Sequence, residues 1–122
     1  MSKYNNKNHG RNLILFEGMK TVRGIYPTDI DAFVEIKNDK FIFIECKYKK
    51  AKLPYGQQLA LKNLVDGMKP EKRAILLIAS HESEGDIMLA DCIVTHYRAK
   101  EKTRKTKREV TVKEFYDWFV NY

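Results

Sequence analysis

The stretch YPTDIDAFVEIKNDKFIFIECKYK, residues Tyr26–Lys49, decides the fold that we predict for this chain. It contains two apolar runs, Ala32–Lys37 and Phe41–Lys47, separated by a short polar segment that includes Asn38 and Asp39. Runs rich in Ile, Phe and Val are typical of β-strands, and an Asn-Asp pair between two such runs is typical of a turn. The sequence therefore predicts a β-hairpin over these residues.

Three charged side chains stand out in this hairpin. Asp31 directly precedes the first strand, while Glu45 and Lys47 lie two residues apart in the second and leave the same face of the sheet. Charged groups on an apolar strand are costly unless they are paired or serve a function. Carboxylates bind Mg²⁺ or Mn²⁺, and a lysine can orient water or offset charge on a phosphate. The pattern indicates phosphodiester hydrolysis, and the competing interpretation is a structural hairpin with a solvent-facing Lys–Glu pair.

The remaining sequence predicts helices and strands around the hairpin. Pro54 is well placed to open a helix that extends to about Gly67. The continuous apolar run Arg73–Ser80 predicts a strand buried on both faces, and Asp91–Tyr97 predicts another strand. Thr111 and Glu114 form the pattern of a capping box at the start of a final helix, in which we expect Phe115, Trp118 and Phe119 to be buried.

The N-terminal region and one later segment complete the predicted order. We expect a flexible arm over residues 1–10, a short helix over Arg11–Lys20 and a basic exposed loop over residues 100–109. The order is then α-β-β-α-β-β-α in a single domain, 1–122. A helix between the second and third strands implies a parallel crossover beside the antiparallel hairpin. The prediction is an α/β fold with a mixed β-sheet flanked by helices.

Composition narrows the partners and the compartment. The chain has 23 Lys and Arg against 16 Asp and Glu, a formal net charge of +7, which favours a polyanionic partner such as nucleic acid. Cys46 and Cys92 lie in apolar runs without disulfide or zinc spacing and are expected to be reduced and buried. No apolar segment has the length of a membrane span or the pattern of a signal peptide. We expect a cytoplasmic protein that has no membrane partner, in the host cytoplasm if it is phage-encoded.

These residues together resemble the PD-(D/E)XK nuclease superfamily, which has the restriction-endonuclease-like fold. The resemblance rests on Asp31 in PTDIDAF, on Glu45-Cys46-Lys47 in FIFIECK, and on the Gln57-Gln58 pair in the following helix. The chain departs from the family pattern because Thr28 separates Pro27 from Asp29, so Asp29 and Asp31 compete for the role of metal ligand. Asp31 is favoured because it directly precedes the apolar strand.

The resemblance implies a small Mg²⁺-dependent or Mn²⁺-dependent endonuclease that acts on DNA. It implies that Asp31, Glu45, the Cys46 carbonyl and Glu17 hold the metal. Lys47 would position the nucleophile, and Gln57 rather than Gln58 would contact a phosphate or a bound water. Similar proteins include stand-alone phage and mobile-element nucleases, Holliday-junction resolvases and virus-type replication/repair nucleases. They recognise DNA structure such as junctions, flaps or nicks, and a homodimer is a possible assembly.

Basic residues outside this motif are the candidate nucleic-acid contacts. They lie directly after the second strand and in the basic segment 100–109, which contains no aromatic residue, so we expect contacts to the phosphate backbone without base readout. Two alternatives are a non-catalytic DNA-binding or regulatory protein on the same fold, and a basic interaction module. The choices between DNA and RNA and between endo- and exonuclease action stay open. The candidate contacts are Lys49, Lys50, Lys52, Lys102, Arg104, Lys105, Lys107 and Arg108.

Overall fold

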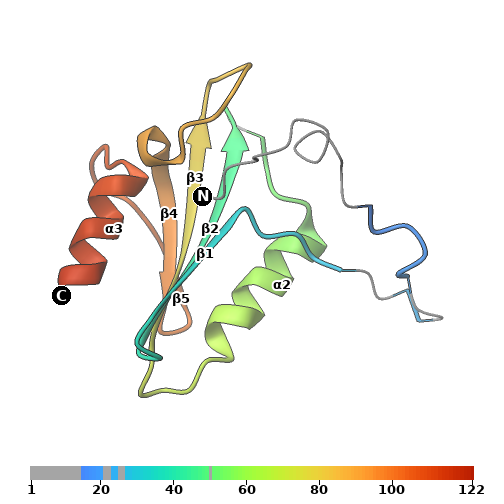
Figure 1. The fold of residues 1–122 in the computed structure, drawn as a ribbon, viewed down its shortest axis with the longest axis horizontal. Helices are drawn as coiled ribbons and strands as arrows, with labels where there is room; N and C mark the ends of the chain where they lie inside the picture. Colours follow the sequence, from blue (N-terminus) through green and yellow to red (C-terminus); the bar gives the residue numbers. More distant parts are fainter. Residues whose placement is uncertain (1–14, 21–22, 25–26, 50) are drawn as a thin grey trace, which may run out of the picture.

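The computed structural model describes residues 15–20, 23–24, 27–49 and 51–122, and its centre is a five-stranded mixed β-sheet (Figure 1). The strands lie in the sheet in chain order, and neighbours are antiparallel except β2 and β3, which are parallel. The predicted α/β class, the hairpin and the parallel crossover are confirmed. The strands are β1 (Ala32–Ile36), β2 (Lys40–Tyr48), β3 (Arg73–His81), β4 (Ile93–Ala99) and β5 (Lys102–Lys105).

Two helices flank the sheet, and Figure 1 shows them on either side of it. Helix α2 (Tyr55–Asp66) connects β2 to β3 and packs Leu61 and Val65 against Phe43 and Leu76. Helix α3 (Val112–Asn121) packs in the second core cluster. The strand residues of that cluster alternate along β2 and β3 with Phe43 and Leu76 and therefore lie on the opposite face of the sheet. Because successive strand residues point to opposite faces, β2 places Phe43, Glu45 and Lys47 on the α2 side.

The C-terminal helix begins and ends with polar contacts. At its start the Thr111 hydroxyl accepts from the Glu114 amide at 3.1 Å and the Glu114 carboxylate accepts from the Thr111 amide at 3.2 Å, which confirms the predicted capping box. At its end the buried Lys40 ammonium donates to the carbonyls of Phe119 and Val120. The expectation that Trp118 is buried is wrong: it is 55% exposed, because it lies beside the inward face of the helix.

The predicted exposed loop over residues 100–109 contains a strand. Lys100 and Glu101 both have positive φ, 51° and 65°, and form the tight turn of a hairpin that pairs β5 with β4. All four β5 residues are exposed, as expected for that segment, but a loop is the wrong structure for Lys102–Lys105. Charged residues are tolerated there because β5 is an edge strand of the sheet.

The N-terminal predictions are only partly covered. The arm over 1–10 and the first part of the expected helix, 11–14, lie outside the described residues. Residues 15–20 do not continue a helix: the Met19 amide donates to the Phe16 carbonyl at 3.1 Å and Gly18 has φ of 82°, which makes a turn. The strand predicted from Asp91 begins at Ile93, because Leu89–Asp91 form the 3₁₀-helix η1. In the part of the chain that is described, no helix is long and apolar enough to cross a membrane.

Candidate active site

Glu45 is the centre of the site. It lies in the C-terminal half of β2, on the face covered by α2, and is only 2% exposed. Its Oε1 forms an ion pair with Lys47 Nζ at 3.1 Å, while the Lys47 side chain stays 23% exposed. The same-face prediction for these two residues is confirmed, and the simple surface-pair interpretation does not fit so buried a carboxylate. The structure thus holds a buried acid against a lysine that still reaches solvent.

Asp31 is held beside Glu45 by the register of the hairpin. Since Ala32 pairs with Ile44, Asp31 lies opposite Glu45 at the end of β1. Asp31 Oδ2 accepts from the Cys46 amide at 2.7 Å, and the Asp31 amide donates to Glu45 Oε2 at 3.3 Å. The Asp31 carboxylate therefore accepts the hydrogen bond of the Cys46 amide just beyond the last β1–β2 pair. This contact fixes the Asp31 side chain next to Glu45.

Gln57 ties helix α2 to the same carboxylate. Its Nε2 donates to Glu45 Oε1 at 2.9 Å and to the Asp29 carbonyl at 3.3 Å. Gln58 is exposed and lines a groove described below. Of the two glutamines it is thus Gln57 that contacts Glu45, while the predicted contact of Gln57 with a phosphate or a bound water stays a prediction. Asp29 takes part through its main-chain carbonyl, whereas Asp31 takes part through both its amide and its carboxylate.

The electrostatics of the site follow from burial. Burial raises the pKa of the Glu45 carboxyl above its usual range, the Lys47 ammonium opposes this by hydrogen bonding, and the negative charge of Asp31 adds to the increase. Burial also raises the pKa of the Cys46 thiol to about 12, and Cys92 adds to that increase. The Cys46 side chain packs against the core cluster of the opposite sheet face, whereas its main chain lies at the site.

Glu17 does not join this cluster. It lies in the exposed turn of residues 15–20, which Figure 1 draws in blue well to the side of the sheet and of α2. The predicted role of Glu17 as a metal ligand assumed a helix packed against the strands, and a turn replaces that helix. The metal role of Glu17 therefore stays a prediction without the helix on which it was based. Lys50, a predicted backbone contact, lies outside the described residues.

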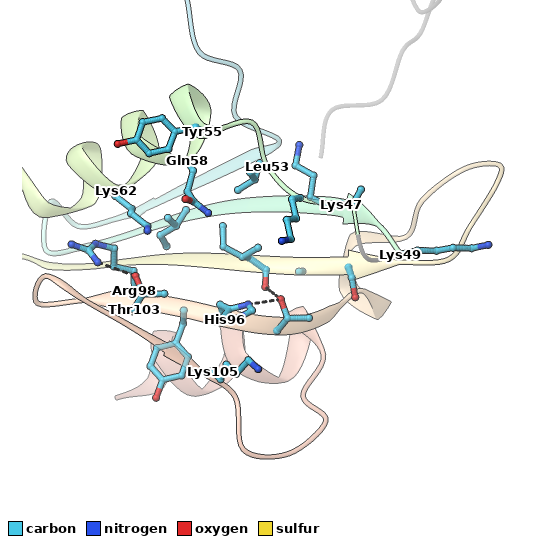
Figure 2. A pocket seen from close by; sticks show the side chains of 18 of the residues that line it. Lys47, Lys49, Leu53, Tyr55, Gln58, Lys62, His96, Arg98, Thr103 and Lys105 are labelled. Atoms are coloured by element: carbon cyan, nitrogen blue, oxygen red, sulfur yellow. Dashed lines mark hydrogen bonds between the residues drawn. The ribbon is translucent and has the colours of Figure 1, made fainter.

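A groove of about 1260 Å³ opens between α2 and the β4–β5 hairpin, and Figure 2 shows its lining. Lys47 points into it, so the groove begins at the candidate site. Its floor includes the apolar residues Leu76 and Ile78 beside polar residues such as Thr95, and Glu82 is the only carboxylate among the lining residues. We call this feature the basic groove, after its six basic lining residues Lys47, Lys49, Lys52, Lys62, Arg98 and Lys105.

The groove divides the predicted nucleic-acid contacts into two groups. Lys49, Lys52 and Lys105 line it. The pairing of Tyr97 with Arg104 and of His96 with Lys105 puts Arg104 and Lys105 on opposite faces of β5. Residues of the predicted set that are described but do not line the groove are Lys102, Arg104, Lys107 and Arg108.

Two basic groove residues were missed by the sequence reasoning. Lys62 projects from α2, and Arg98 from β4, where it forms a two-pronged ion pair with Asp66 at 2.9 and 2.6 Å. The signal for Arg98 was available, since His96 and Arg98 are polar residues two apart in the predicted strand and therefore leave one face. Nothing local marks Lys62, because its role depends on which helix packs beside which strand.

The donor set fits a hard divalent cation of the Mg²⁺ type. Two adjacent carboxylates, Asp31 and Glu45, are the kind of protein ligands with which Mg²⁺ is commonly held, together with water and substrate phosphate. Glu45 accepts three contacts of the roughly four that a carboxylate can take, and Asp31 Oδ2 accepts one. Among the described residues, no group of three or more His, Cys, Asp or Glu side chains is arranged to hold a metal. Any cation here depends on the pair of carboxylates.

Comparison with known proteins adds no relative. No protein-family model, no curated protein and no solved structure matches this chain.

Proposed function

We propose that this protein is a metal-dependent nuclease of the PD-(D/E)XK type, which hydrolyses phosphodiester bonds in DNA. The observation that carries the proposal is the buried Glu45 carboxylate, 2% exposed, in contact with Lys47 and Gln57 and adjacent to Asp31. Burying an acid on an apolar strand is unfavourable unless it is paired or used. The opening of this cluster onto a basic groove supports phosphate as the substrate group.

In this proposal each residue of the cluster has a separate task. Asp31 and Glu45 would hold Mg²⁺ or Mn²⁺ between β1 and β2, with the Cys46 carbonyl as a further oxygen ligand. A bound cation of this kind lowers the pKa of a water and polarises a phosphoryl oxygen. Lys47, partly exposed at the mouth of the groove, offsets the negative charge that develops on the phosphate or orients the attacking water. Gln57 keeps Glu45 in place through its hydrogen bond and thereby acts as a positioning residue.

The fold supports the same proposal. A mixed sheet in which an antiparallel hairpin carries the acids and a parallel crossover follows agrees with the restriction-endonuclease-like arrangement that the motif implies. The described order, β-β-α-β-β-β-α, differs from the expected one by the additional strand β5 and by the turn over residues 15–20, where a helix was expected. Recognition of junctions, flaps or nicks, and assembly as a homodimer, belong to the same proposal and rest on the resemblance.

The test is cleavage of a panel of linear duplex, single strand, nicked circle, flap and four-way junction, with Mg²⁺, with Mn²⁺ and with EDTA. We expect metal-dependent cleavage by the wild type, and a loss of about a hundredfold or more in Asp31→Asn and Lys47→Met. Asp29→Asn is the matched control, because its side chain is exposed and only its main chain contacts Gln57. Wild-type protein that binds DNA but cuts no member of the panel would contradict the proposal and favour the non-catalytic DNA-binding alternative.

A further inference from the structure

The basic groove has two basic walls and an apolar floor. Lys62 lies on α2 and Lys52 in the segment just before it, while Lys49 follows β2 and Lys105 ends β5. Between them the lining includes the half-buried Leu53 and Ile78, and Leu76, which is buried. None of these four lysines forms an ion pair within the described part of the chain, whereas Arg98 is neutralised by Asp66. The walls therefore present uncompensated positive charge above apolar side chains.

Aromatic groups border the same groove. Tyr55, at the first position of α2, is 76% exposed, and Figure 2 shows it above the groove beside Gln58. His96 lies on the strand side, where its Nδ1 contacts the Thr95 hydroxyl at 3.0 Å. His96 is half-buried, whereas the exposed ring of Tyr55 can stack on a base, and every base has a face suitable for stacking.

This combination discriminates between two forms of nucleic acid. A duplex presents phosphates on its outside and keeps its base faces stacked within the helix, so it would meet the lysine walls and leave the apolar floor uncovered. An unpaired strand presents phosphates and free base faces together, which match the walls and the floor at the same time. The charge of the walls and the apolar side chains of the floor together therefore favour an unpaired strand over a duplex.

We infer that the basic groove binds an unpaired nucleic-acid strand and leads it to the cluster of Asp31, Glu45 and Lys47. The unpaired strand would be the form of substrate for the proposed nuclease. Only the statement that the strand leads to the catalytic cluster rests on that proposed function. Binding itself needs no catalysis. It can therefore be measured without metal, and its success or failure is separable from that of the proposed function.

The edge strand β5 provides a matched pair of variants. Lys105 and Arg104 are adjacent, exposed and basic, but Lys105 lines the groove and Arg104 points to the opposite sheet face. Lys105→Glu and Arg104→Glu make the same change of charge on the same strand. A second pair is Lys62→Glu on α2 and Lys69→Glu in the loop after it, where Lys69 is exposed and outside the groove.

The experiment measures fluorescence anisotropy of labelled oligothymidylate of about 20 nucleotides, and of a mixed-sequence duplex of the same length, in EDTA. We expect the wild type to bind the single strand about tenfold or more tightly than the duplex at about 0.15 M salt. Lys105→Glu and Lys62→Glu should each weaken single-strand binding about tenfold and reduce the salt slope by about 0.7. Arg104→Glu and Lys69→Glu should each stay within about threefold of the wild type.

Each outcome decides the inference. Duplex binding equal to or tighter than single-strand binding would overturn it, as would equal losses in Lys105→Glu and Arg104→Glu. Oligouridylate of the same length, measured in parallel, shows whether the groove prefers single-stranded RNA or single-stranded DNA. Preference for either of the two over the duplex supports the groove as the binding site. Cleavage without single-strand preference would remove the inference and keep the nuclease, whereas single-strand binding without cleavage would keep the groove and remove the nuclease.

Discussion

Replacing Gln57 by glutamate should turn the contact that holds Glu45 into a repulsion. Gln57→Glu keeps the size of the side chain but replaces the donor at 2.9 Å from Glu45 Oε1 by an acceptor. The lost hydrogen bond to a charged group is worth about 1.5–3 kcal/mol. Two carboxylates about 4 Å apart repel by about 4 kcal/mol at an effective dielectric constant of about 20. Because Lys47 offsets part of this repulsion, we expect a net loss of about 3 kcal/mol of unfolding free energy at about pH 8.

The loss should depend on pH with a defined sign. Burial already raises the pKa of Glu45, and a second carboxylate beside it raises the affinity of the pair for a proton further. The folded variant then binds more protons than the unfolded chain between the usual glutamate pKa and the raised value. Its stability therefore falls as the pH rises through that window, and the difference from the wild type should be smaller at about pH 5 than at about pH 8.

Urea unfolding of wild type, Gln57→Glu and Gln58→Glu measures the effect. Gln58 precedes Leu59 on the same helix and is exposed, so Gln58→Glu should change the unfolding free energy by no more than about 0.5 kcal/mol. Equal effects of the two substitutions, or a Gln57→Glu loss that does not grow with pH, would refute the contact between Gln57 and Glu45.

Three further predictions concern charge and capping. Glu45→Gln removes an acid whose pKa is raised, so the unfolding free energy of the wild type relative to this variant should fall as the pH rises from about 4.5 through the raised pKa. Urea unfolding in metal-free buffer measures this difference, and a difference that does not change with pH would contradict the raised pKa. Lys40→Met leaves the carbonyls of Phe119 and Val120 without their donor and should lower the unfolding free energy by about 2 kcal/mol; no change would show that this buried ammonium contributes nothing net. Thr111→Ala should lower it by about 1 kcal/mol through loss of the cap, and calorimetry would contradict this if the midpoint did not move.

Much of the candidate site could be predicted because it depends on local geometry. The alternation of β2 puts Glu45 and Lys47 on one face, and the hairpin register puts Asp31 opposite Glu45. The position of Gln57 in the first turn of the crossover helix brings it back over the same strand. These contacts follow from residue spacing and from one short turn.

The parts that failed depend on features that spacing does not encode. The sequence Lys102–Lys105 is entirely polar, and a charge-rich segment predicts a loop, yet an edge strand needs no apolar face. Its turn uses positive φ at Lys100 and Glu101 without glycine or asparagine, so no turn signal was present. The groove was not predictable, because its walls come from a helix and a hairpin that meet only in the folded chain.

The measurement that tests the central claim most directly compares two glutamate variants in Mg²⁺-dependent cleavage of the preferred substrate. Glu45→Gln removes the buried carboxylate of β2, and Glu35→Gln removes an exposed carboxylate of the neighbouring strand, whose contact is to the Asn38 amide of the turn. We predict a loss of about a hundredfold or more in Glu45→Gln and near wild-type cleavage in Glu35→Gln, with both variants folded. Cleavage by Glu45→Gln at the wild-type rate would contradict the assignment of this cluster as a metal-dependent nuclease site.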